Sequence, residues 1–162
     1  MMPVILIGFM AAGKSTIAKA LSQKNFIDLD QAIEKEIEMP IMQFFQEHGE
    51  DRFRQIERET LEAAVLSGFN VATGGGIVKL EENRKCLKKM KEVVYLKADF
   101  ETLYNRILSD KENSRPLALQ TRKEVEKLFQ QRESFYKEVA DIIIETKDKS
   151  PEEIAQEIQE LK

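Results

Sequence analysis

A glycine loop near the N-terminus limits what this chain can fold into more than any other segment. Residues Gly8 to Ser15 read GFMAAGKS and fit the phosphate-binding loop pattern G-x-x-x-x-G-K-[ST]. The apolar residues 4–7 before the loop predict a short buried strand, and residues 15–21 after it predict a helix. Such a loop cradles anions, because backbone N–H groups and the positive end of the helix dipole converge there. Lys14 would then reach the β- and γ-phosphates of a nucleotide, and the Ser15 hydroxyl would ligate Mg²⁺.

Strand and helix patterns alternate along the rest of the chain, which predicts an α/β fold with a mostly parallel sheet. Further strands are expected at 25–28, 71–73, 93–96 and 142–144. Further helices are expected at 31–38, 41–48, 50–66, 81–90, 100–108, 123–139 and 151–161. The long helix 50–66 offers apolar residues for the core, namely Phe53, Ile56, Leu61, Ala64 and Val65. The 162 residues fit a single domain spanning 1–162.

Two aspartates follow the second predicted strand. Ligands bind beyond the carboxyl ends of strands in open α/β sheets, so Asp28 and Asp30 belong to the same region as the glycine loop. Alternation along an extended segment would point both side chains the same way. One carboxylate would support Mg²⁺ and the other would accept or hold a substrate hydroxyl proton. The alternative is that an aspartate, Asp30 included, only caps the next helix.

Glycines and arginines supply the remaining polar candidates. The run from Gly74 to Gly76 follows a predicted strand and would let backbone N–H groups approach a ligand. Arginine forks grip carboxylates and phosphates, but periodicity cannot choose between Arg54 and Arg58, which lie one helical turn apart. Arg115 lies beside a proline in the polar segment 109–121, which we interpret as a lid that brings a cation over transferring phosphate.

Composition excludes several other classes of function. The 25 basic and 29 acidic residues give a net charge of −4, which argues against nucleic-acid binding. No apolar run approaches the roughly 20 residues of a membrane span, and no signal peptide precedes the first strand, so we expect a cytoplasmic protein. The single cysteine, Cys86, excludes an internal disulfide, and the single histidine, His48, suits a helix end better than catalysis.

Taken together, these motifs resemble the shikimate kinases, a branch of the small P-loop kinases related to nucleoside monophosphate kinases. The matching segments are Gly8-Phe9-Met10, Asp28 with Asp30, Phe53-Arg54-Gln55-Ile56-Glu57, Thr73-Gly74-Gly75-Gly76-Ile77-Val78, Arg115-Pro116-Leu117, and Arg132 ahead of Phe135-Tyr136. The resemblance covers essentially the whole chain. It implies a three-layer fold with a five-stranded parallel sheet flanked by helices, a lid at about 109–121 and a substrate-binding helical region at about 31–66.

The resemblance also implies an activity and a site. The activity is ATP- and Mg²⁺-dependent phosphorylation of the shikimate 3-hydroxyl, a step toward chorismate and the aromatic amino acids. Implied catalytic residues are Lys14, Asp30 and Arg115, with Ser15 and Asp28 at the metal. Shikimate would be bound by Asp30, Arg54, Gly75, Gly76 and Arg132, which selects Arg54 over Arg58. ATP would be bound by Gly8, Ala11, Ala12, Gly13, Lys14, Ser15, Thr16, Arg106, Arg115 and Lys149.

The sequence departs from the family pattern near the expected adenine site, and other functions remain as alternatives. Lys149 stands before Pro151 where the family often has an arginine near the adenine, and lysine cannot stack or fork as arginine does. The alternatives are a kinase for another small polyol acid such as gluconate, a nucleotide kinase, or a catalytically silent nucleotide-binding relative. Arg54, Arg132 and the paired aspartates argue against the first two. Retention of Lys14, Ser15, Asp28, Asp30 and Arg115 argues against the third. We expect a monomer whose partner is a small molecule.

Overall fold

The structure is a computed structural model that describes residues 3–109 and 120–161. Its strands are β1 (Ile5–Ile7), β2 (Phe26–Asp28), β3 (Asn70–Ala72), β4 (Val93–Lys97) and β5 (Ile142–Glu145). Its helices are α1 (Lys14–Leu21), α2 (Leu29–Ile37), α3 (Ile41–His48), α4 (Glu50–Val65), α5 (Glu81–Lys88), α6 (Phe100–Ser109), α8 (Arg122–Val139) and α9 (Pro151–Leu161). Each strand and helix expected from the sequence is present, with ends shifted by at most two residues.

The strands form one sheet in the order β2-β3-β1-β4-β5, and every neighbouring pair is parallel. The expected five-stranded parallel sheet is therefore confirmed. Strand β1 lies at the centre, where Ile5 pairs with Val71 on one side and Val93 on the other. Parallel strands covered on both faces read as continuous apolar runs, and all three residues of β1 are buried.

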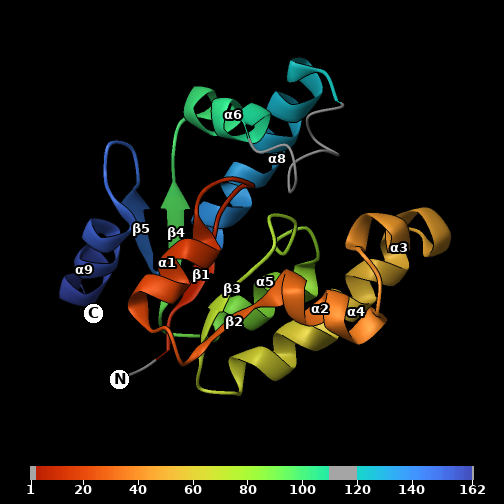
Figure 1. The fold of residues 1–162 in the computed structure, drawn as a ribbon, viewed down its shortest axis with the longest axis horizontal. Coiled ribbons are helices and arrows are strands. Elements are labelled where there is room, and N and C mark those ends of the chain that lie inside the picture. The colour runs from red at the N-terminus through yellow and green to blue at the C-terminus, as the bar shows by residue number, and fades with distance from the viewer. Residues whose placement is uncertain (1–2, 110–119, 162) are drawn as a thin grey trace.

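Helices surround the sheet and continue beyond its carboxyl edge (Figure 1). Helix α1 packs with α9, and α5 packs with α8, which itself packs against β4. Helices α2, α3 and α4 pack on one another and form a group beside β2 on the right of Figure 1, whereas α6 packs with α8 at the top. The loop after β1 thus lies between these two groups of helices, which is where a ligand would be enclosed.

The core consists of apolar side chains from the sheet and the inward faces of the helices. On α4, Phe53, Leu61 and Ala64 are buried, and Ile56 and Val65 pack partly buried against the core. His48 is the last residue of α3 and contacts the Phe44 ring at a centroid distance of 4.6 Å, consistent with the structural position expected for it. Within the described residues, no helix is long and apolar enough to cross a membrane.

One local expectation is wrong. The segment from Asp28 to Asp30 is not extended, because α2 begins at Leu29 and its N-cap is Asp28. The Asp28 side chain accepts a hydrogen bond from the backbone N–H of Gln31 at 3.1 Å, which satisfies one of the free donors of the first turn. The helix therefore starts two residues earlier than expected. The cap is Asp28, not Asp30, and the two aspartates do not share a side through strand alternation.

Candidate active site

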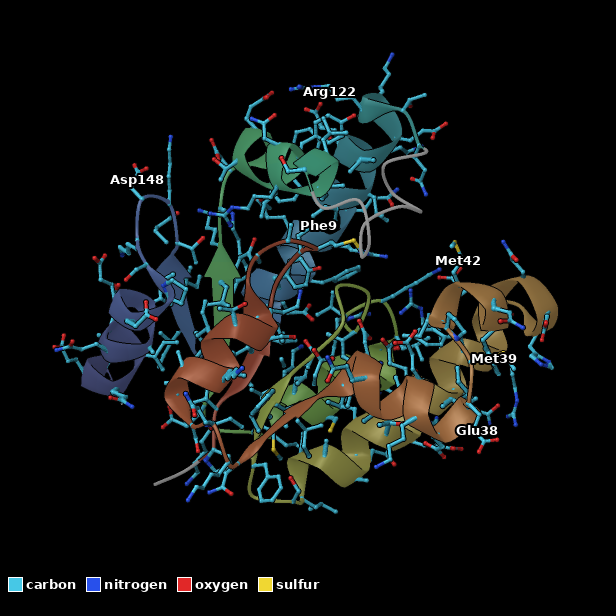
Figure 2. The ribbon with its side chains drawn as sticks, in the orientation of Figure 1. Phe9, Glu38, Met39, Met42, Arg122 and Asp148 are labelled. Atoms are coloured by element: carbon cyan, nitrogen blue, oxygen red, sulfur yellow. The ribbon has the colours of Figure 1, made fainter. Side chains whose placement is uncertain are left out.

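The loop from Gly8 to Gly13 joins β1 to α1 in a conformation that favours glycine at both of its ends. A Cβ added at Gly8 would lie 2.8 Å from the Leu96 carbonyl oxygen, so a side chain there would collide with β4. Gly13 is the N-cap of α1 with φ 93°, and Ala11 also has a positive φ of 68°. Phe9 is buried in this loop and packs edge-on against Phe129 of α8, at a centroid distance of 5.4 Å (Figure 2). The loop is thereby held as a preformed turn at the helix N-terminus.

Lys14, the first residue of α1, directs its ammonium group into this loop. Its Nζ donates hydrogen bonds to the carbonyl oxygens of Gly8 at 2.5 Å and Phe9 at 3.0 Å. Burial lowers the pKa of Lys14 to about 8, while the nearby Asp30 carboxylate opposes that shift. A bound anion would favour the charged form, so the loop and Lys14 together suit a phosphate. Ser15 and Thr16 follow on the exposed side of the first turn.

The two residues expected at Mg²⁺ meet each other. The Ser15 hydroxyl donates a hydrogen bond to Asp28 Oδ2, joining the start of α1 to the end of β2. A hydroxyl and a carboxylate are the hard oxygen donors that Mg²⁺ takes, usually with waters and substrate phosphates completing the octahedron. Among the described residues, no cluster of three or more histidine, cysteine or acidic side chains could hold a metal alone. The pair therefore fits a metal that a nucleotide also coordinates.

Asp30 lies in the first turn of α2, beside the glycine loop that follows β3. A Cβ added at Gly74 would lie 2.7 Å from Asp30 Oδ1 and 3.3 Å from Glu57 Oε2, so only glycine fits between these carboxylates. Burial, together with the negative charge of Glu57, raises the pKa of Asp30 to about 6, although Lys14 opposes the shift. A carboxylate with this pKa is ionised at neutral pH yet accepts a proton more readily than an ordinary aspartate.

Arg54 contacts the same glycine loop from α4. Its guanidinium is buried and donates to Glu57 Oε1 at 2.8 Å and to Glu50 at 3.4 Å. A Cβ added at Gly76 would lie 2.5 Å from both terminal nitrogens of Arg54. Arg58, one turn further on, makes no ion pair within the described residues, and its buried Nε has no hydrogen-bond acceptor there. Of the two arginines that the sequence left open, the structure therefore brings Arg54 to the loop.

Arg132 reaches the loop from α8. Its Nη1 lies 3.5 Å from the position of a Cβ added at Gly75. Burial lowers the pKa of Arg132, and the positive charge of Arg54 lowers it further. Two guanidinium groups from separate helices thus converge on the three glycines and repel each other. That arrangement is suited to a planar anion placed between them.

The expected nucleotide contacts are divided between described and undescribed parts of the chain. Arg106 Nη1 donates to the Ala11 carbonyl oxygen at 3.2 Å, beside a cavity of about 500 Å³ lined by Ala11, Gly13, Asn105, Arg106 and Ser109. Lys149 is not among the residues that line this cavity, and its Nζ pairs with Glu157 Oε2 of α9 at 2.8 Å. Arg115 and most of the expected lid lie outside the described residues.

Two residues that touch these groups were not assigned from the sequence. Glu57 is buried and bonds to Arg54, and burial raises its pKa while Arg54 opposes the shift. Its spacing of three residues from Arg54 on one helix was the available signal. The Tyr136 hydroxyl donates a hydrogen bond to the Gly75 carbonyl, and the four-residue spacing from Arg132 was the corresponding signal.

These features define a P-loop phosphotransferase. They are a phosphate loop after the central strand, an adjacent hydroxyl–carboxylate pair, and a second anion site at the glycine loop 74–76. Comparison with known proteins narrows the class. The shikimate kinase family model matches residues 10–162. A shikimate kinase from Lactococcus lactis is 52% identical over 159 residues, covering 98% of this chain and 97% of the relative. One from Enterococcus faecalis is 44% identical and covers 98% of both chains. This chain therefore belongs to the shikimate kinase family.

Solved structures agree with that assignment. A shikimate kinase from Acinetobacter baumannii in complex with shikimate superposes with a TM-score of 0.91 at 32% identity, covering 99% of this chain and 92% of the other. The shikimate kinase from Aquifex aeolicus superposes with a TM-score of 0.81 at 34% identity, covering 99% and 95%. The three-layer P-loop kinase fold expected from the sequence is thereby confirmed.

Proposed function

We propose that this protein transfers the γ-phosphoryl group of ATP to the 3-hydroxyl of shikimate and so acts in aromatic amino acid biosynthesis. The observation that carries the proposal is the position of the glycine loop 74–76. Gly75 lies near both the phosphate loop and Arg132, Gly76 lies near Arg54, and Gly74 lies near Asp30. A carboxylate held by the arginines would place the rest of a small polyol acid next to Asp30 and the phosphate loop.

Each group then has a role that matches its environment. Arg54 and Arg132 bind the shikimate carboxylate, and the N–H groups of Gly75 and Gly76 assist them. Asp30 orients the attacking hydroxyl and takes its proton, for which its raised pKa suits it. Lys14, now bonded to loop carbonyls, moves its ammonium onto the β- and γ-phosphate oxygens and neutralises charge that develops there.

The donor side completes the proposed site. The loop residues from Gly8 to Thr16 bind the phosphates of ATP, and Arg106 binds near the adenine beside the cavity that it lines. Ser15 and Asp28 would hold Mg²⁺, which would supply positive charge to neutralise the phosphates during transfer. We also propose that Arg115 closes from the lid segment 109–121 onto the phosphates, and that residues 31–66 form the shikimate-binding region. Lys149 remains a weaker proposal for ATP binding because it pairs with Glu157.

The test is ADP release with Mg-ATP and a panel of shikimate, quinate, gluconate and nucleoside monophosphates. We expect turnover with shikimate, little with the others, and loss of turnover when EDTA removes the metal. Folded protein that turns over gluconate or a nucleoside monophosphate in preference to shikimate would refute the proposal. No turnover with any acceptor would favour the silent nucleotide-binding alternative.

We also propose that the enzyme is cytoplasmic and monomeric and that it binds only small molecules. The slight excess of acidic residues and the absence of a spanning helix among the described residues support it. Light scattering across a range of protein concentrations tests the monomer, and a mass that doubles at micromolar concentration would contradict it.

A further inference from the structure

A buried tyrosine lies directly behind the glycine loop. Tyr136 is completely buried on α8, and its ring stacks on Tyr95 of β4 with centroids 5.1 Å apart. The Tyr136 hydroxyl donates a hydrogen bond to the Gly75 carbonyl, joining segments 61 residues apart in the sequence. Burial raises the pKa of this hydroxyl, so it stays protonated and able to donate at neutral pH.

The hydrogen bond from Tyr136 also sets the orientation of the peptide that joins Gly75 to Gly76. The described peptide bonds are all trans, and in a trans peptide the C=O and N–H groups point in opposite directions. The Gly75 carbonyl and the Gly76 N–H belong to the same peptide, so holding the oxygen against α8 directs this N–H away from Tyr136. The Arg54 guanidinium lies against the Gly76 end of this peptide.

Without such an anchor, the loop could turn this peptide over. Glycine has no Cβ to restrict its backbone, and both residues that flank this peptide are glycines. A flipped peptide would present a carbonyl oxygen, in place of an N–H, on the side that receives a ligand. Facing a carboxylate, that exchange replaces an attraction with a repulsion.

The same hydroxyl is also next to Arg132, one turn earlier on α8. The interaction with Tyr136 raises the pKa of Arg132 and so opposes the larger effect of burial. Gly75 has Arg132 on one side and the Tyr136 hydroxyl on its carbonyl. One hydroxyl therefore contacts two of the groups that are proposed to surround the substrate carboxylate.

We propose that Tyr136 is a positioning residue for substrate binding: its hydroxyl locks the Gly75–Gly76 peptide with the N–H toward the substrate carboxylate and holds Arg132 beside it. This inference rests on the proposed function, because it assumes that the acceptor is a carboxylate held by Arg54 and Arg132. Under this inference, a side chain of α8 sets the orientation of the glycine loop from the side opposite the substrate.

The test compares Tyr136→Phe with the matched control Tyr95→Phe. Tyr95 is buried in the same ring stack, and its hydroxyl makes no hydrogen bond to the glycine loop within the described residues. Both changes remove one hydroxyl and keep both rings. Isothermal titration with shikimate is run on wild type and both variants in saturating Mg-ADP, since a bound ligand stabilises the folded state. Circular dichroism establishes that each variant is folded at the temperature used.

We expect Tyr136→Phe to weaken shikimate binding by roughly three- to tenfold, the value of one buried hydrogen bond, and Tyr95→Phe to change it by less than about twofold. Affinity for Mg-ADP alone should be unchanged in both variants. The shikimate methyl ester, which has no anionic carboxylate, should bind wild type weakly and should lose little further affinity in Tyr136→Phe.

Three results would overturn the inference. They are equal effects of the two variants on shikimate, equal weakening of nucleotide and shikimate in Tyr136→Phe, and a full loss that persists with the methyl ester. A Tyr136→Phe protein that stays unfolded even in Mg-ADP would also overturn it, because the hydroxyl would then be needed for the fold itself. If wild type fails to bind shikimate, the proposed function fails, and that outcome is distinct from all four.

Discussion

Replacing Asp30 by asparagine should abolish catalysis and at the same time stabilise the unliganded protein. The carboxylate is buried next to Glu57, and these two influences raise its pKa to about 6 although Lys14 opposes them. Asparagine keeps the shape of the side chain and removes its charge. The variant therefore loses the group proposed to take the hydroxyl proton, and it also loses the cost of keeping that group ionised.

The size of the stabilisation follows from the shift in pKa. The Asp30 pKa of about 6 in the folded protein, against 3.8 for an unperturbed aspartate, corresponds to about 3 kcal/mol of unfolding free energy. The folded protein binds the proton more tightly than the unfolded chain does. The destabilisation is therefore absent below pH 3.8, grows as pH rises toward 6, and is complete above that pH. Asp30→Asn should recover up to about 3 kcal/mol at pH 7.5 and about half of that at pH 5.

Urea unfolding at pH 7.5 and pH 5 measures this difference. The control is Glu36→Gln, which neutralises an exposed carboxylate on the same helix. We expect the control to change stability by less than about 0.5 kcal/mol. In the activity assay, kcat of Asp30→Asn should fall by at least about 100-fold while ATP binding is kept. A variant that is no more stable than wild type at pH 7.5, or whose gain does not shrink at pH 5, would refute the electrostatic reasoning. Equal loss of ATP binding would refute the assignment of Asp30 to the acceptor.

Three further changes test other contacts. Arg54→Ala should raise the KM for shikimate by roughly 100-fold or more, because it removes a charged hydrogen-bond partner and leaves Glu57 buried without that partner. The control Arg58→Ala should change this KM little. Steady-state kinetics at saturating ATP measure both, and equal effects would contradict the choice of Arg54. Gly76→Ala should displace the Arg54 guanidinium, because the new Cβ would lie 2.5 Å from it. The KM for shikimate should rise with little change in the KM for ATP. An unchanged shikimate KM would show that substrate binding does not need the close contact between Gly76 and Arg54. In the pH profile of kcat/KM for shikimate, the value should fall below about pH 6 as Asp30 of the free enzyme is protonated, and a value that stays constant to pH 5 would exclude Asp30 as the base.

The fold was largely predictable because its signals are local and repeated. The apolar run before the phosphate loop, the alternation of strand and helix patterns and the proline at the start of α9 each mark an element by residue type alone. The error came at Asp28, where two uses of the same side chain compete. An aspartate at the end of a strand can continue the extended chain or cap a helix, and strand alternation does not include the hydrogen bond to the Gln31 N–H that favours the cap.

The candidate site was predictable by residue type but not by partner. Arg54 and Arg58 are equivalent in the helical pattern, and only tertiary contacts with Glu57 and the glycine loop separate them. Lys149 looks available for a nucleotide in the sequence, yet Glu157 from the following helix takes its ammonium group. Such pairings depend on how elements far apart in the chain approach each other, which neither periodicity nor spacing determines.

The charges around the glycine loop also favour the binding of a charged ligand. The positive charge of Arg54 lowers the pKa of Arg132, and the negative charge of Glu57 raises the pKa of Asp30. Such like-charge pairs persist only where the surrounding structure holds them, and they are typical of sites prepared for a charged ligand. A carboxylate bound between the arginines would cancel the first repulsion, and proton transfer to Asp30 would relieve the second. Both like-charge pairs are therefore placed where the proposed reaction brings the opposite charge or the proton that would neutralise them.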